Sequence, residues 1–185
     1  MPYLNNKLAF IDLETTGLEP EHHEILEIGL VLAEQSLSPD KKIALNVLEE
    51  WDVKVKPKHI ENADLEGLKI NKYSPADWLF AVDLPKALEA LSGKTADAIM
   101  VGHNVSFDFA FLEKGFEQTG IPNKMHYHKL DTISIAFAKL YTHEDMEKLS
   151  LRALCEYLGV ENKKAHSALS DARATYEVFL KLMAL

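Results

Sequence analysis

Residues 7–18 read Lys-Leu-Ala-Phe-Ile-Asp-Leu-Glu-Thr-Thr-Gly-Leu and place two carboxylates inside an apolar run. The run and the turn residues that follow it predict a strand over residues 7–14. Alternate side chains of a strand share a face, so Asp12 and Glu14 lie on one face of the expected sheet. Two like charges on a buried face are unfavourable unless a cation lies between them. An oxygen-preferring ion such as Mg²⁺ or Mn²⁺ would supply that charge, whereas a strand end that reaches solvent would need none.

The remaining chain continues with strands and then alternates helices with a strand. Short links between the first three strands favour antiparallel hairpins. The segment 57–83 shows no clean period and carries no prediction. Apolar periodicity and stop residues predict strands over 24–34, 43–55 and 98–102, and helices over 84–91, 107–119, 133–140, 149–158 and 168–182. This order predicts an α/β domain, a mixed sheet with helices packed on it.

Composition bounds the class of protein. With 185 residues, 47% of them hydrophobic and 26% charged, the chain is expected to form one domain over residues 1–185 with a packed core. It contains no membrane-spanning run of about 20 apolar residues and no secretory signal. The single cysteine, Cys155, suits a reducing compartment, so a cytoplasmic location is expected. The net charge of −9 argues against a protein that neutralises long duplex DNA, but does not exclude an enzyme acting on nucleic-acid ends, whose metal ions would attract the phosphate.

A second acidic segment, residues 102–108, reads Gly-His-Asn-Val-Ser-Phe-Asp and follows the predicted strand 98–102. It places Asp108 at the start of a helix, where the helix dipole favours an anion. Ligands of α/β proteins usually bind at such carboxyl ends of strands. The plain alternative is that Ser106 caps the helix and Asp108 only stabilises its first turn.

A third segment joins His166 to Asp171. A spacing of five does not put two side chains on one helical face. We therefore expect His166 on a loop and Asp171 inside the first turns of the helix. Histidine accepts protons near neutral pH, which suits a general base. Taken alone, this spacing is a weak signal.

Together, these segments resemble the three motifs of the DEDD superfamily of 3′→5′ exonucleases, in the DEDDh branch with a histidine in the third motif. Residues 12–18 resemble the first motif, residues 102–108 the second, and His166 with Asp171 the third. The resemblance extends from Leu8 to Phe179. Within the family, the chain is similar to the proofreading epsilon subunit of bacterial DNA polymerase III, to oligoribonuclease and to ribonuclease T. Residues 64–71 match the family only loosely, so the resemblance assigns no substrate preference.

The resemblance implies a ribonuclease-H-like fold: a five-stranded mixed sheet, three antiparallel strands followed by parallel ones, with helices on both faces. It implies that two Mg²⁺ or Mn²⁺ ions hydrolyse the terminal phosphodiester bond and release nucleoside 5′-monophosphates. The implied metal ligands are Asp12, Glu14, Asp108 and Asp171, and the implied general base is His166. The implied contacts to the 3′-terminal nucleotide are Thr15, Thr16 and Leu18, with Asn104 placing the loop or reaching the substrate.

Several alternatives stay open at this point. The substrate could be single-stranded DNA or RNA, including RNA 3′-end trimming of the oligoribonuclease type. The chain could instead be a non-catalytic nucleic-acid-binding module associated with a polymerase, although such a module has no need of all five motif residues. A phosphohydrolase unrelated to nucleic acids would leave His166 and Asp108 unexplained. The expected partners are 3′ ends of single strands and either a DNA polymerase or a second copy of the chain; no membrane is expected.

Other patterns predict structure, not chemistry. Asp131 precedes an apolar helical run and is expected to cap it. Phe107 and Phe111, at helical spacing, are expected to pack in the core, as is Cys155. The stretch 126–128, His-Tyr-His, lacks a nearby third ligand, so no zinc site is predicted there.

Overall fold

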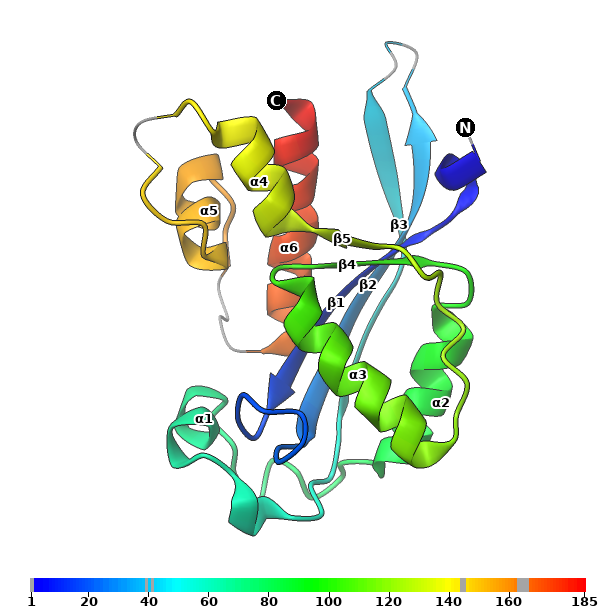
Figure 1. The fold of residues 1–185 in the computed structure, drawn as a ribbon, viewed down its shortest axis with the longest axis vertical. Coiled ribbons are helices and arrows are strands. Elements are labelled where there is room, and N and C mark those ends of the chain that lie inside the picture. Colours follow the sequence, from blue (N-terminus) through cyan, green and yellow to red (C-terminus); the bar gives the residue numbers. More distant parts are fainter. Residues whose placement is uncertain (1, 39, 41, 144–145, 163–166) are drawn as a thin grey trace.

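The computed structural model describes residues 2–38, 40, 42–143, 146–162 and 167–185, and these form one mixed sheet with strand order β3-β2-β1-β4-β5 (Figure 1). The first three strands pair antiparallel, and β4 and β5 extend the sheet in parallel with β1. The strands are β1 (Leu8–Thr15), β2 (Ile25–Leu37), β3 (Ile43–Lys54), β4 (Ile99–Gly102) and β5 (Lys129–Asp131). The predicted fold class is confirmed. The three residues of β5 were not located from the sequence, because so short and partly exposed a strand carries no readable alternation.

Helices cover both faces of this sheet (Figure 1). On one face lie α2 and α3; on the other lies α6, with α4 and α5 packed against it. The helices are η1 (Pro2–Asn5), η2 (Ile60–Asn62), α1 (Leu65–Ile70), α2 (Leu84–Lys94), α3 (Val105–Thr119), α4 (Thr132–Leu140), α5 (Leu151–Leu158) and α6 (Ala168–Ala184). Cys155 is buried in the cluster between α4, α5 and α6, as expected. Within the described residues, no helix has the length and apolar character needed to cross a bilayer.

The alternation of β1 decides where the acidic residues point. Ala9, Ile11 and Leu13 belong to the core cluster beneath α2 and α3, whereas Leu8 and Phe10 belong to the cluster beneath α6. By the same period of two, Asp12 and Glu14 lie on the α6 face. The expectation that both carboxylates share one face is confirmed.

The segment 57–83, which shows no hydrophobic period, is attached to the sheet by hydrogen bonds. The indole of Trp78 is buried and donates to the Leu26 carbonyl at 3.0 Å. The N–H of Asp64, just before α1, donates to the Thr16 carbonyl at 2.8 Å. The Asn71 amide, just after α1, donates to the Thr15 carbonyl at 2.7 Å. Hydrogen bonds, and not an apolar helix face, attach this segment to the sheet. Helix α1 therefore has no buried residue, and its sequence shows no helical pattern.

Asp131 caps two helices at once. Its carboxylate accepts the N–H of Ile133 at 2.8 Å, which confirms the predicted cap of α4. It also accepts the N–H of Val105 at 3.1 Å and that of Asn104 at 3.2 Å, at the start of α3. The alternative in which Ser106 caps this helix is wrong, because α3 begins at Val105 after Asn104 turns the chain with φ of 65°. The acceptor comes from a residue distant in sequence.

Candidate active site

Three carboxylates converge where β1 meets the first turn of α6. Asp12 and Glu14 extend from β1 and Asp171 from α6, and one oxygen of each lies within 4.8 Å of the others. The expected placement of Asp171 inside the first helical turn is confirmed. Carboxylate oxygens at this spacing are a ligand set for a hard divalent cation.

A glycine allows α6 to approach the sheet so closely. Gly29 of β2 is paired with Asp12 across the β1–β2 ladder. A Cβ built on Gly29 would lie 2.2 Å from the carbonyl carbon of Ala168, the first residue of α6. Any other side chain would push α6 away from β2, and Asp171 away from the two carboxylates of β1.

The fourth expected carboxylate, Asp108, lies beneath β1. Its Oδ1 accepts the N–H of Leu13, the residue between Asp12 and Glu14, at 2.9 Å. Only 4% of Asp108 is exposed, and burial raises the pKa of its carboxyl from 3.8 to about 7. The hydrogen bond fixes α3 to β1, so all four motif carboxylates lie around the end of one strand.

The mutual repulsion of these carboxylates favours binding of a cation. Burial, followed by the charges of Asp108, Asp171 and Glu14, raises the pKa of Asp12 well above its usual value. Burial and then the charge of Asp171 raise the pKa of Glu14 to about 8, opposed only in part by Lys72. Because these carboxylates repel one another and are mostly shielded from water, the donor set fits the implied divalent ions.

The metal-free protein is therefore expected to lose stability between about pH 4.5, the usual pKa of a glutamate, and about pH 8. Below this window, the Glu14 carboxyl is protonated in both the folded and the unfolded state. Within it, the unfolded chain ionises while the folded chain keeps its proton, so the free energy of unfolding falls by roughly 1.4 kcal/mol per pH unit for such a group.

Urea denaturation in EDTA at pH 5 and pH 8 measures this effect. The midpoint should be lower at pH 8, and Mg²⁺ should restore it by binding the folded state. Glu14→Gln serves as the control and should flatten the pH dependence. A metal-free wild type that is more stable at pH 8 than at pH 5 would contradict the assignment.

A fifth carboxylate, Glu27 of β2, was missed by the sequence analysis. It is paired with Glu14 across the β1–β2 ladder and is 7% exposed. It accepts the N–H of Ala168 at 3.2 Å and lies 3.4 Å from the Ser167 hydroxyl, so it holds the start of α6. Burial raises its pKa. The sequence shows that Glu27 and Gly29, two residues apart, lie on the same face of the strand. It does not show that Glu27 pairs with Glu14, because that depends on the strand register.

Of the expected substrate residues, Thr15 ends β1, Thr16 and Leu18 lie on the loop that follows it, and Asn104 lies just before α3. The Thr15 hydroxyl donates to the Gly17 carbonyl at 2.7 Å, and the Thr16 hydroxyl accepts the N–H of Glu24 at 2.8 Å. Leu18, in contrast, is 76% exposed. Asn104 is exposed at the start of α3. Contact of these four residues with a substrate stays a prediction.

Two further expectations concern histidines. His166, the implied general base, lies outside the described residues, between Asn162 and Ser167. Among the described residues near it in sequence, the Asn162 amide donates to the Asp171 carboxylate, and the Ser170 hydroxyl donates to the Asn162 side-chain oxygen at 2.9 Å. The His126 ring stacks on Tyr127 and the His128 ring is tilted against it. Neither histidine belongs to the acidic group, the one metal-ligand cluster among the described residues.

This fold and this site define a class, the metal-dependent nucleases with an acidic cluster at the end of the central strand of a mixed sheet. The Exonuclease family model, RNase_T, matches residues 9–179, so the chain belongs to that family, the DEDD 3′→5′ exonucleases.

Curated relatives include PolC-type DNA polymerase III and ribonuclease T. The PolC-type DNA polymerase III of Thermotoga petrophila is 30% identical over 180 residues, covering 97% of this chain but 12% of that protein. The ribonuclease T of Hahella chejuensis is 29% identical over 188 residues, covering 94% of this chain and 81% of that protein. The chain thus spans about an eighth of the length of the PolC-type relatives that it matches.

Solved structures share the fold. Exonuclease I of E. coli in complex with a dA16 oligonucleotide matches with a TM-score of 0.78 at 17% identity, covering 97% of this chain and 41% of that one. The nuclease domain of 3′hExo, a DEDDh family member bound to rAMP, matches with a TM-score of 0.72 at 15% identity, covering 97% and 92%. These likenesses confirm the ribonuclease-H-like exonuclease fold.

Proposed function

We propose that this chain is an active exonuclease that removes nucleotides from the 3′ end of single-stranded nucleic acid and releases nucleoside 5′-monophosphates. The observation that carries the proposal is the convergence of Asp12, Glu14 and Asp171 within 4.8 Å, with Asp108 bonded to the same strand. A phosphohydrolase needing only the two carboxylates of β1 would have no use for Asp108 or for the loop that carries His166.

The four carboxylates would hold two divalent ions, either Mg²⁺ or Mn²⁺. Asp12, Glu14 and Asp171 would hold one ion, with Asp12 shared, and Asp108 would hold the second directly or through water. Bound ions of this kind stabilise the attacking and leaving oxygens of a phosphodiester. His166, five positions before Asp171 in the sequence, would accept the proton of the attacking water, because histidine exchanges protons near neutral pH.

The substrate would enter along the β1–β2 loop. Leu18 is exposed next to the acidic strand, which supports an apolar contact with the terminal base. Thr15 and Thr16 would contact the terminal sugar through the loop, and Asn104 would lie at the start of α3. Solved relatives include complexes with dT13 and dA16 oligonucleotides and with rAMP, so they support both a DNA and an RNA substrate.

We propose single-stranded DNA as the first candidate substrate, because PolC-type polymerases contain the similar segment. A DNA polymerase would then be the partner. RNA 3′-end trimming is the second candidate, and the match to 81% of a ribonuclease T supports it.

A gel time course tests the proposal. Matched single-stranded DNA and RNA oligonucleotides, labelled at the 5′ end, are incubated with Mg²⁺, Mn²⁺ or EDTA. We expect a metal-dependent ladder that shortens from the 3′ end, and the faster substrate decides between DNA and RNA. Binding of either strand without degradation would instead support a non-catalytic module. Neither binding nor degradation would favour a phosphohydrolase.

Glu27 offers a more specific prediction about how the site is assembled. Glu27→Ala should lower kcat by about 10- to 100-fold, the cost of removing a group that orients a metal ligand, and leave KM nearly unchanged. Glu27→Gln should recover most of kcat, because the amide oxygen can still accept the N–H of Ala168. Steady-state kinetics on a labelled oligonucleotide measure both values, with the exposed Glu34→Ala as the matched control on the same strand. Equal losses in the Ala and Gln variants would assign Glu27 a role through its charge and not through the hydrogen bond.

A further inference from the structure

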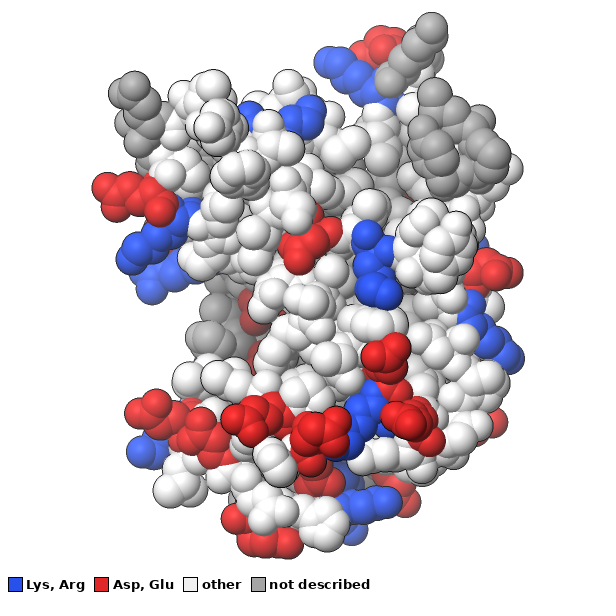
Figure 2. All heavy atoms as spheres, in the orientation of Figure 1, with Lys and Arg blue, Asp and Glu red and all other residues white. Residues whose placement is uncertain are grey.

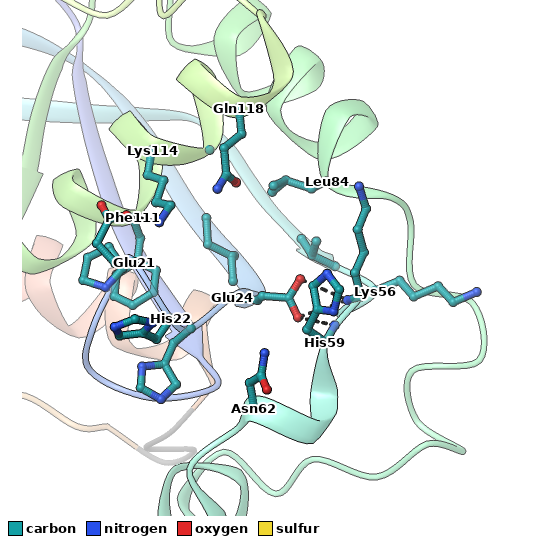
Figure 3. A pocket seen from close by; sticks show the side chains of 16 residues that line it. Glu21, His22, Glu24, Lys56, His59, Asn62, Leu84, Phe111, Lys114 and Gln118 are labelled. Carbon is teal, nitrogen blue, oxygen red and sulfur yellow. Dashed lines mark hydrogen bonds and ion pairs between the residues drawn. The ribbon is translucent and has the colours of Figure 1, made fainter.

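A cavity of about 650 Å³ opens between the β1–β2 loop, the segment after β3 and helix α3 (Figure 3). None of the four candidate metal ligands lines it, so it is separate from the acidic cluster. Lys114 and Gln118 reach it from α3, His22 from the loop, and His59 and Asn62 from the η2 segment. Its volume lies within the roughly 300–1,000 Å³ typical of sites for small molecules.

The floor of this cavity is apolar. It is lined by Ile25, Val55, Leu84 and Phe111. Ile25, Val55 and Phe111 are each exposed by 4% or less and belong to the core cluster under α3, so the floor is fixed by the packing of the domain. A flat apolar group can rest on such a surface without rearrangement.

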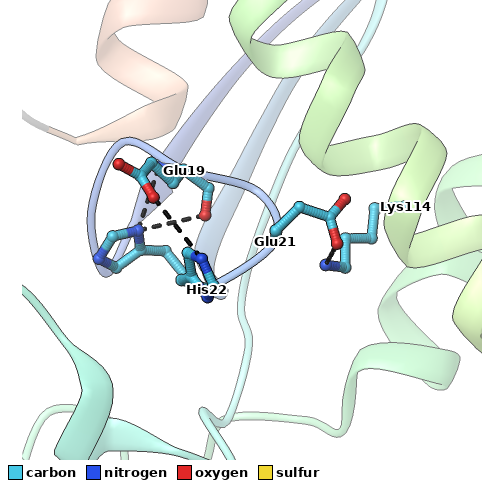
Figure 4. Close-up of polar contacts among 5 residues, drawn as sticks. Glu19, Glu21, His22 and Lys114 are labelled. Carbon is cyan, nitrogen blue, oxygen red and sulfur yellow. Dashed lines mark hydrogen bonds and ion pairs between the residues drawn. The ribbon is translucent and has the colours of Figure 1, made fainter.

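Both carboxylates in the cavity wall are already bonded. Glu21 forms an ion pair with Lys114, and this hydrogen bond lowers the pKa of Glu21 (Figure 4). The Glu24 carboxylate accepts the backbone N–H of Lys58 at 3.0 Å and that of His59 at 2.8 Å. Lys114 therefore offsets the charge of Glu21, and two backbone N–H groups occupy the Glu24 carboxylate.

The cations are not offset in the same way. Among the described residues, the ammonium groups of Lys56 and Lys58 form no ion pair, although both lysines line the cavity. Acidic side chains gather over the lower part of the face in Figure 2, and the whole chain has a net charge of −9. Two lysines without an ion pair beside a fixed apolar floor therefore favour an anion that also has an apolar part.

We propose that this cavity is a second nucleotide-binding pocket, in which Lys56 and Lys58 bind one phosphate and the base lies on the apolar floor. The ligand is a nucleoside monophosphate unit, either free or as one residue of a single strand. This inference goes beyond the proposed function and does not depend on it.

The pocket shares a wall with the candidate active site. His23 lines it, and its Nδ1 lies 3.0 Å from the Glu19 backbone nitrogen. A Cβ on Gly17 would lie 2.3 Å from the same imidazole, so the ring packs directly on the loop residue between Thr16 and Leu18. A bound nucleotide would rest against the loop that carries Leu18.

The test is an NMR titration of the full chain with adenosine 5′-monophosphate in EDTA, observing the imidazole signals of His22 and His59. We expect saturable shifts of both signals in the wild type. Lys56→Ala/Lys58→Ala should weaken the affinity by about tenfold or more, equivalent to about 1.4 kcal/mol. The fold should survive, because Glu24 bonds the backbone of Lys58 and not its side chain. The control Lys139→Ala/Lys181→Ala removes the same charge from exposed positions on α4 and α6 and should bind like the wild type.

Further titrations distinguish a free nucleotide from a nucleotide that is part of a strand. Inorganic phosphate should bind more weakly than the nucleotide, and adenosine without phosphate should bind at least about tenfold more weakly. An oligonucleotide with a blocked 3′ end that shifts the two histidines at lower concentration than the mononucleotide would identify the ligand as part of a strand. The reverse order would identify it as the free nucleotide.

Other results would overturn the proposal. These are the absence of saturable shifts, equal affinity in the Lys56/Lys58 variant, or tighter binding of an aspartate-rich peptide than of any nucleotide. Because this titration needs neither metal nor cleavage, its failure leaves the exonuclease proposal intact, and an inactive enzyme leaves the pocket proposal intact.

Discussion

Asp12→Asn is expected to abolish metal-dependent hydrolysis while leaving the metal-free protein at least as stable as the wild type at pH 7. The loss of activity should exceed about 100-fold, since removal of an outer-shell partner alone can reach that size. The stability is expected to hold or rise because burial and four neighbouring carboxylates oppose ionisation of Asp12 in the folded state. An amide of the same shape removes that repulsion together with the ligand.

Three measurements check this expectation: the cleavage rate of a labelled oligonucleotide, calorimetric titration with Mn²⁺, and urea denaturation in EDTA. Asp83→Asn is the matched control, because Asp83 is exposed and its side chain makes no capping hydrogen bond to α2. Equal Mn²⁺ affinity in wild type and Asp12→Asn would remove Asp12 from the ligand set. A large loss of metal-free stability would show that Asp12 stabilises the fold through contacts that outweigh its repulsion.

His166→Ala is expected to lower kcat by about 10²- to 10⁴-fold, the usual contribution of a general base, without changing Mn²⁺ affinity. In the wild type, the rate should rise with pH through the range in which histidine loses its proton. In the variant, this rise should disappear, because bound Mn²⁺ keeps the remaining site carboxylates ionised. A kcat–pH profile of both proteins at saturating Mn²⁺ measures the effect.

The exposed His128→Ala is the control, since His128 lies outside the acidic cluster. A variant that keeps the wild-type pH profile with a reduced rate would assign His166 to substrate placement. A variant with weakened Mn²⁺ binding would assign it to the ligand set.

Local chain geometry made much of this site predictable. The period of two in residues 7–14 put Asp12 and Glu14 on one face, and the structure confirms it. The helical positions of Asp108 and Asp171 followed from the strand end at Gly102 and from the apolar periodicity of residues 168–182. Asp131 was recognised as a cap because an N-cap acts on a residue two positions away. Each of these inferences needs only interactions between near neighbours in sequence.

The remaining features depend on which distant residues meet. Asp131 also caps α3, 26 residues earlier at Val105. Glu27 holds the start of α6 from a position 141 residues away at Ala168. The need for glycine at position 29 follows from the passage of the Ala168 backbone over it. The cavity beside the β1–β2 loop is assembled from a loop, a strand end and two helices. The sequence by itself determined strands β1 to β4, helices α2 to α6 and the shared face of Asp12 and Glu14, because periodicity is local. Only the tertiary structure decided strand register, helix docking and the enclosed space, because these come from contacts whose spacing in sequence carries no pattern.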